Sequence, residues 1–156
     1  MSKPTPNILV IGFGNPGHRD DGLGPAFAAR FEALNLPGVT VESDYQLTIE
    51  HAELAARHDL VVFVDAATDV EAGAPFYLRP VQPAADTVVF SHSVSPQAVL
   101  HLAARLFAAR PKAWLLGIRA EDLDSFAEGL TPQAEANLRT ALKAFCDAFF
   151  SGRLIR

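Results

Sequence analysis

One stretch near the amino terminus restricts the fold more than any other. The apolar run at residues 7–11 passes directly into a loop, residues 12–24, that holds five glycines, one proline and two adjacent aspartates, and a helical pattern follows. A strand that leads through such a loop into a helix is typical of α/β proteins, which place ligands at the carboxyl ends of their strands. The loop is therefore the first candidate for a functional site.

Apolar runs and helical patterns alternate along the rest of the chain. The predicted strands are residues 7–12, 39–43, 60–67, 87–90 and 113–118, with a short edge strand at 75–79, and the predicted helices are residues 23–34, 48–57, 95–107 and 131–149. Parallel neighbours need helical crossovers, so this order predicts one α/β domain over residues 1–156. We expect a three-layer α/β/α sandwich of the phosphorylase/hydrolase-like kind, with a twisted, mostly parallel sheet of about five strands.

The composition of the chain disfavours some classes of binding partner. The 156 residues carry a formal net charge of -5, and the 13 Lys and Arg residues are scattered along the chain. Binding to a nucleic-acid backbone or to an anionic membrane needs a basic face, so we expect neither partner. A single cysteine, Cys146, excludes an internal disulfide, and no segment has the length of a transmembrane span or the pattern of a signal peptide. These features predict a cytoplasmic protein, which we expect to be a monomer.

The loop sequence GFGNPG at residues 12–17 satisfies the dinucleotide-binding pattern GxGxxG. A pyrophosphate binds there because backbone N–H groups and the helix dipole attract its negative charge. In this chain Asp20 and Asp21 occupy that place and would repel the phosphate. We therefore disfavour nucleotide binding.

The same carboxylates are suited to a cation. Asp21 follows the first strand, Asp65 ends the apolar run at residues 60–64, and His92 follows the predicted strand at 87–90. In a parallel sheet these three positions gather at one edge. Two carboxylates and an imidazole form a mixed site for a borderline divalent metal such as nickel or zinc, with open positions for water or substrate. The structural alternative is that Asp20 and Asp21 cap the following helix while Asp65 binds loop amides.

Three motifs carry a family resemblance. GFGNPGHRDDGLG at residues 12–24, FVDAA at 63–67 and HSVSPQAVL at 92–100 together resemble the hydrogenase maturation endopeptidases, in the order that this family uses. The resemblance implies a hydrolase that recognises nickel in the large-subunit precursor of a nickel-iron hydrogenase and removes its carboxyl-terminal extension. It also implies that nickel arrives with the substrate.

The family's three nickel-contacting side chains correspond to Asp21, Asp65 and His92. At the position of Asp21 the family often has a glutamate. The aspartate side chain is shorter, so its carboxylate reaches less far. From the residues alone, Asp21 or Asp65 can either bind the metal or act as a general base on water. Together with the resemblance, this implies that both are catalytic residues of an aspartyl-type endopeptidase. The sequence does not choose between these roles.

Two other functions stay open. A peptidyl-tRNA hydrolase shares the Gly-Asn-Pro-Gly loop, but the acidic balance of this chain disfavours an RNA partner. The other is a non-catalytic module that docks onto a nickel-bearing partner through Asp21, Asp65 and His92. The sequence barely separates this module from the peptidase.

Overall fold

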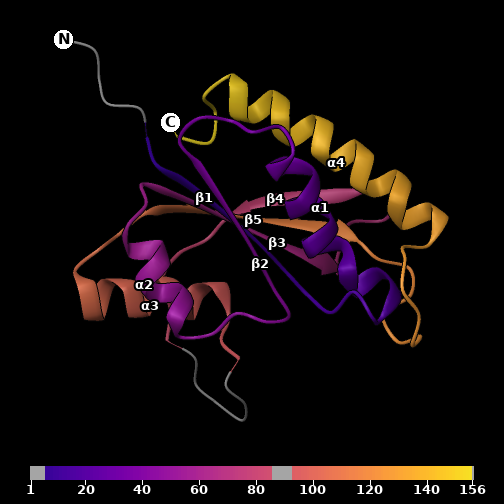
Figure 1. Ribbon diagram of the computed structural model, residues 1–156, viewed down its shortest axis with the longest axis horizontal. Helices are drawn as coiled ribbons and strands as arrows, with labels where there is room; N and C mark the ends of the chain where they lie inside the picture. The colour runs from indigo at the N-terminus through magenta and orange to yellow at the C-terminus, as the bar shows by residue number, and fades with distance from the viewer. Residues whose placement is uncertain (1–5, 86–92, 156) are drawn as a thin grey trace.

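The computed structural model describes residues 6–85 and 93–155, in which strands and helices alternate (Figure 1). The strands are β1 (Ile8–Phe13), β2 (Val39–Asp44), β3 (Leu60–Ala67), β4 (Phe76–Pro80) and β5 (Lys112–Arg119). The helices are α1 (Leu23–Glu32), α2 (Glu50–Ala56), α3 (Pro96–Phe107) and α4 (Pro132–Phe150), and a short 3₁₀ helix, η1 (Arg19–Gly22), precedes α1.

The strands form one sheet in the order β2-β1-β3-β5-β4. β2, β1, β3 and β5 are parallel, and β4 pairs with β5 in the antiparallel direction. β4 ends in Pro80 at the edge of the sheet, where the missing N–H breaks no ladder. The predicted strand at residues 87–90 lies outside the described residues.

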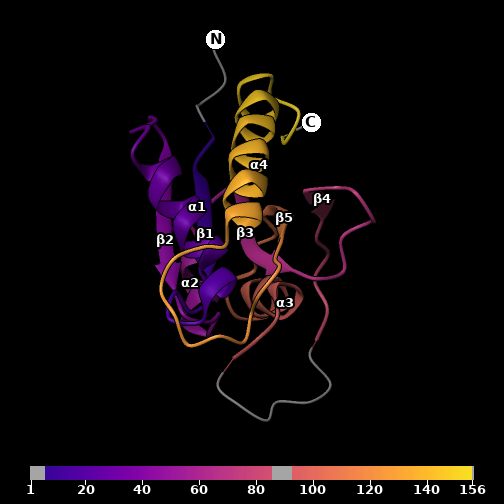
Figure 2. The ribbon, with the colours of Figure 1, turned by 90° about the vertical axis from the view of Figure 1, so that its right-hand side faces the viewer.

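Helices cover both faces of the sheet, α1 and α4 on one and α2 and α3 on the other (Figure 2). Successive residues of the buried strands alternate between the two cores. In β1, Val10 packs with the α1 and α4 side, whereas Leu9 and Ile11 pack with the α2 and α3 side. The predicted three-layer α/β fold with a mostly parallel sheet is confirmed.

Two helix starts follow their sequence signals. Ser95 caps α3 and Thr131 caps α4, each through a side-chain oxygen that accepts a hydrogen bond from a backbone N–H three residues on, at 3.1 Å and 3.2 Å. Proline follows each cap, where its missing N–H costs nothing. No helix in the described part of the chain is both long and apolar enough to cross a membrane.

Candidate active site at the carboxyl edge of the sheet

The loop after β1 brings η1 and α1 close to the sheet. Gly24, in the first turn of α1, lies so near the strand ends that an added Cβ would be 2.4 Å from the carbonyl oxygen of Phe13 and 2.5 Å from that of Val64. Only a glycine fits this approach. The contact fixes the start of α1, and with it η1, at the carboxyl ends of β1 and β3.

Asp21 is held above this loop. Gly14 has a φ of 143°, and a Cβ there would lie 2.0 Å from the carbonyl oxygen of Asp21, so the close approach requires glycine. The Asp21 carboxylate accepts a hydrogen bond from the backbone N–H of Asn15 at 2.8 Å. Asn15 in turn accepts one from the N–H of Gly17 at 2.9 Å. The glycines therefore shape the loop, and the loop orients the carboxylate.

Asp65 lies in β3, one residue after the buried run that ends at Val64. Burial raises the pKa of Asp65 to about 7, a hydrogen bond from the backbone of Ala66 opposes this rise, and the charge of Asp21 adds to it. The two carboxyl groups are thus electrostatic neighbours. Asp65 therefore binds a proton readily near neutral pH, and a divalent cation beside it would favour its ionised form.

The raised pKa of Asp65 predicts a pH-dependent stability. In the folded state Asp65 holds a proton at pH values where the unfolded chain has lost it, so ionisation costs stability as the pH rises from about 4 to about 7. A pKa change of this size corresponds to at most ~4 kcal/mol, and partial exposure of the group reduces this. We expect Asp65→Asn to stabilise the fold by roughly 2 kcal/mol at pH 8 and not at pH 4.

Urea denaturation of both proteins at the two pH values measures this difference. Asp59→Asn, on the loop before β3, serves as a control because Asp59 is exposed and the asparagine oxygen can still accept the hydrogen bond from the N–H of Asn7. An equal stability of wild type and Asp65→Asn at pH 8 would contradict the raised pKa.

A tyrosine that the sequence analysis missed lies on the same row of the sheet as Asp65. Gly117 of β5 pairs in register with Asp65 on one side and with Tyr77 of β4 on the other. A Cβ on Gly117 would lie 2.3 Å from Cζ of Tyr77, so the ring covers the glycine. The Arg79 guanidinium lies 3.8 Å from the centre of the ring. Tyr77 therefore forms a wall of the site toward β4.

The electrostatics of Tyr77 agree with this position. Burial and the negative charge of Asp69 raise the pKa of the Tyr77 phenol, and the charge of Arg79 opposes the rise. The charge of Asp65 raises it further. No sequence pattern indicates this contact, because it depends on the antiparallel pairing of β4 and on an empty position at Gly117.

We expect Gly117→Ala to destabilise the protein by about 1–2 kcal/mol, because the new methyl group displaces the Tyr77 ring. Urea denaturation of Gly117→Ala, Tyr77→Ala and the double variant forms a double-mutant cycle. In the Tyr77→Ala background the same methyl group should cost less. Additive losses in the double variant would show that the ring does not lie against Gly117.

Asp20 has a different role from its neighbour. It is fully buried, and its carboxylate accepts four hydrogen bonds. The donors lie in the loop between β5 and α4: the backbone N–H groups of Glu121, Asp122 and Thr131 and the hydroxyl of Thr131, all at 2.8–2.9 Å. Burial alone would raise the pKa of Asp20, but these hydrogen bonds together lower it below its ordinary value.

The alternative interpretation of the aspartates as helix caps is wrong. Gly22 is the residue before α1, and no side chain caps this helix. Both aspartates lie within the 3₁₀ turn of η1, before the first turn of α1. Asp20 instead ties the site to a distant loop, and Asp21 remains available at the edge of the sheet.

His92, the third predicted metal ligand, lies outside the described residues. Among residues 6–85 and 93–155, no three His, Cys, Asp or Glu side chains are grouped so that they could hold a metal ion. The structure brings Asp21 and Asp65 near enough for the charge of Asp21 to raise the pKa of Asp65. A position of His92 beside them stays a prediction. The described chain resumes at Ser93, and the N–H of Val94 donates to the carbonyl of Leu47 at 3.1 Å.

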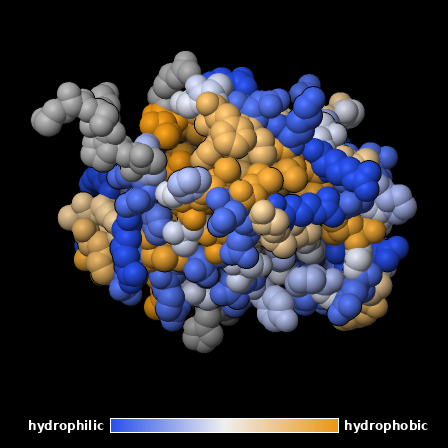
Figure 3. Space-filling model, turned by 45° about the horizontal axis from the view of Figure 1, so that its top comes forward, coloured by the Kyte–Doolittle hydropathy of each residue, from blue (hydrophilic) through white to orange (hydrophobic). Residues whose placement is uncertain are grey.

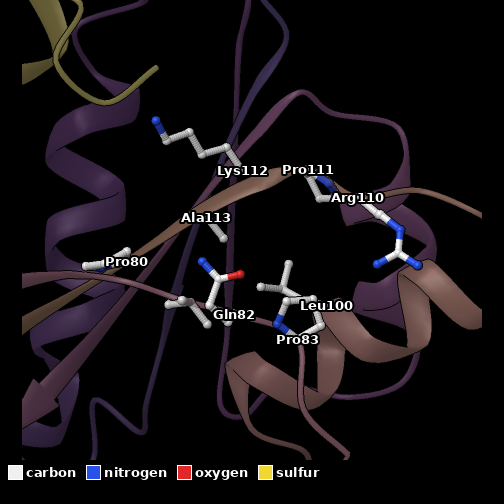
Figure 4. Close-up of a pocket in the computed structure, with 9 residues that line it drawn as sticks. Pro80, Gln82, Pro83, Leu100, Arg110, Pro111, Lys112 and Ala113 are labelled. Carbon is white, nitrogen blue, oxygen red and sulfur yellow. The ribbon is translucent and has the colours of Figure 1, made fainter. Parts of the chain in front are cut away.

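Two cavities lie at opposite ends of the sheet. One, of about 190 Å³, adjoins the candidate site and is lined by Gly14, Pro16 and Tyr45 among others. The other, of about 310 Å³, lies at the amino end of β5, where the side chains of Arg110 and Lys112 point away from each other (Figure 4). Of these two, the first borders the loop after β1, since Gly14 both lines it and lies against the backbone of Asp21.

Comparison with known proteins reveals structural relatives. No protein-family model matches the sequence, and no curated protein matches it either. Among solved structures, the hydrogenase maturating endopeptidase HybD from E. coli is similar at 27% identity with a TM-score of 0.68, over 94% of this chain and 93% of that one.

Two further solved structures show the fold alone. An endopeptidase from Escherichia coli has 24% identity and a TM-score of 0.71, over 94% of this chain and 93% of its own. The [NiFe] hydrogenase maturation protease HycI from Thermococcus kodakarensis KOD1 has 20% identity and a TM-score of 0.69, over 90% of each chain. The resemblance predicted from the three sequence motifs is confirmed: over nearly its whole length this chain is similar to the hydrogenase maturation endopeptidases, a family of hydrolases.

Proposed function

We propose that the chain is an endopeptidase that recognises nickel in the precursor large subunit of a nickel-iron hydrogenase and removes its carboxyl-terminal extension. The observation that carries the proposal is the pair of carboxyl groups, Asp21 and Asp65, at the carboxyl edge of the sheet, close enough that the charge of one raises the pKa of the other. The similarity to an E. coli hydrogenase maturating endopeptidase supports the same function.

In this proposal nickel is part of the substrate. Asp21, Asp65 and His92 contact it, and the metal is supplied by the precursor and not held permanently by this chain. Carboxylate and imidazole ligands suit a divalent metal of intermediate softness. The bound nickel then positions the adjoining peptide over the loop after β1.

Asp65 is the better candidate for the general base. Burial raises its pKa to about 7 in the metal-free chain, so this carboxylate is a stronger base than an ordinary aspartate. In the proposed step Asp65 takes a proton from water, the oxygen of this water attacks the scissile carbonyl carbon, and the carbon–nitrogen bond breaks. The proton passes to the leaving amine, and the free extension departs. Asp21, oriented by the N–H of Asn15, takes no part in this proton transfer and contacts the nickel together with Asp65.

The test is the mass of a nickel-loaded hydrogenase large-subunit precursor after incubation with the chain. The proposal predicts a fixed loss from the carboxyl terminus of the precursor. An unchanged mass with retained binding would favour the docking module instead. Absence of binding, together with cleavage of peptidyl-tRNA, would exclude both functions. A cytoplasmic location and a monomeric state remain predictions. Size-exclusion chromatography tests the monomeric state.

A further inference from the structure

The loop between β5 and α4 carries an exposed aromatic side chain next to the candidate site. Phe126 is 88% exposed, the largest exposed fraction among the large hydrophobic residues of the described chain. Figures 1 and 2 show this loop running beside the start of α1, although the two segments are about a hundred residues apart in sequence. Nearly the whole ring of Phe126 is therefore accessible to a partner.

This loop is held firmly in place. The backbone N–H of Arg19 donates to the carbonyl oxygen of Ala127 at 2.8 Å, and that of Asp20 donates to the carbonyl oxygen of Asp122 at 2.9 Å. The ring of Phe126 lies 4.7 Å from the ring of His18, centre to centre. With the four hydrogen bonds to the Asp20 carboxylate, these contacts order the loop that carries Phe126, and His18 supports one side of its ring.

A preordered aromatic side chain is what a protein interface uses as an anchor. Binding costs less when the side chain and its loop are already ordered, and aromatic residues in a pocket supply much of the affinity of protein complexes. Arg19 also adopts a φ of 55°, a conformation that is uncommon outside glycine. The backbone strain lies at the point where the candidate site meets the loop.

Exposure alone does not identify such a surface. Apolar side chains reach the surface elsewhere too (Figure 3), and Phe150, at the far end of α4, is 64% exposed. Phe126 differs because its ring contacts His18, which lies three residues before Asp21 in the chain. A partner that covers Phe126 therefore lies beside the loop that carries Asp21.

The charge around Phe126 indicates the chemistry of the partner. Glu121, Asp124 and Glu128 are exposed in the same loop, and none of the ion pairs found in the described residues involves them. Complementary charge steers and orients protein partners. The partner surface should therefore place lysine or arginine side chains around an apolar pocket.

We propose that Phe126 is an anchor by which the chain docks onto the folded body of its protein substrate, in an apolar pocket with a basic rim. This inference rests on the proposed function, because it takes the substrate to be the hydrogenase precursor. The interaction is separate from the contact of nickel with Asp21 and Asp65. The contact of Phe126 supplies affinity for the folded precursor, and the carboxylates act in the cleavage of the peptide bond.

Steady-state cleavage of the nickel-loaded precursor tests the inference. Phe126→Ala should raise KM at least about tenfold and leave kcat within about twofold, since truncation of an interface anchor weakens binding by this order. Phe126→Tyr should keep a KM near that of the wild type. Phe150→Ala is the matched control, an equally large truncation of an exposed ring, and should change neither constant. Thermal melting verifies that each variant is folded.

An unchanged KM for Phe126→Ala, or a loss confined to kcat, would overturn the inference and leave the proposed function intact. If the wild type binds the precursor without cleaving it, the proposed peptidase function fails, and the dissociation constants of wild type and Phe126→Ala still decide on the anchor. If the wild type does not bind the precursor at all, both fail.

Discussion

Asp20→Ala is expected to destabilise the protein by about 3–5 kcal/mol at pH 7, because three backbone N–H groups and one hydroxyl lose the buried carboxylate that they share as acceptor. Few other single changes in the described chain remove so many contacts. The loop between β5 and α4 should detach from η1, and the cap at Thr131 should lose its fixed position. Urea denaturation, followed by circular dichroism, measures the loss.

The effect of Asp20 should depend on pH in a defined direction. Its pKa is lowered in the folded state, so its contribution is fully present above the ordinary aspartate pKa of 3.8 and is lost as the pH falls through the folded-state value. The difference between wild type and Asp20→Ala should therefore shrink below pH 4. Asp124→Ala, on the exposed part of the same loop, should cost less than about 0.5 kcal/mol. A loss of less than about 1 kcal/mol for Asp20→Ala would contradict the role assigned to Asp20.

Asp65→Asn is expected to reduce cleavage of the nickel-loaded precursor by roughly a thousandfold, because an amide neither accepts a proton from water nor supplies a negative charge to nickel. The same variant should be more stable than the wild type at pH 8, as argued above. A variant that is more stable but cleaves more slowly has lost catalytic function and not its fold. The rate of precursor cleavage, measured by mass spectrometry under single-turnover conditions, provides the test.

Asp21 provides a matched pair of variants. Asp21→Asn should lose activity to a similar extent, whereas Asp21→Glu restores the residue type frequent in the family and should retain activity within about tenfold of the wild type. Full activity of either asparagine variant would remove that residue from the proposed site.

Most of the fold follows from local sequence. The strands β1, β3 and β5 are built on continuous apolar runs, and helical patterns separate these runs, so their parallel arrangement follows from the need for crossovers. The glycines of the first loop also predict a close approach of backbone to backbone, and the structure places η1 there.

The parts that the sequence did not predict depend on long-range contacts. The sequence suggests that Asp20 is a helix cap because it precedes a helix. In the structure, the hydrogen-bond donors to its carboxylate are 101 to 111 residues away. The covering of Gly117 by Tyr77 requires the antiparallel register of β4, which no local pattern specifies. In the sequence, Phe126 is a residue of an acidic loop. Its position beside His18 depends on the hydrogen bonds that join this loop to Asp20.

The most direct test of the central claim is the rate at which the wild-type chain cleaves the same precursor with and without nickel. Both forms should be prepared at equal concentration, and the release of the carboxyl-terminal extension should be followed by mass spectrometry. Recognition of nickel by Asp21 and Asp65 predicts rapid, single-site cleavage of the nickel-loaded precursor and none of the nickel-free form. Equal cleavage of both forms, or cleavage of neither, would contradict the claim.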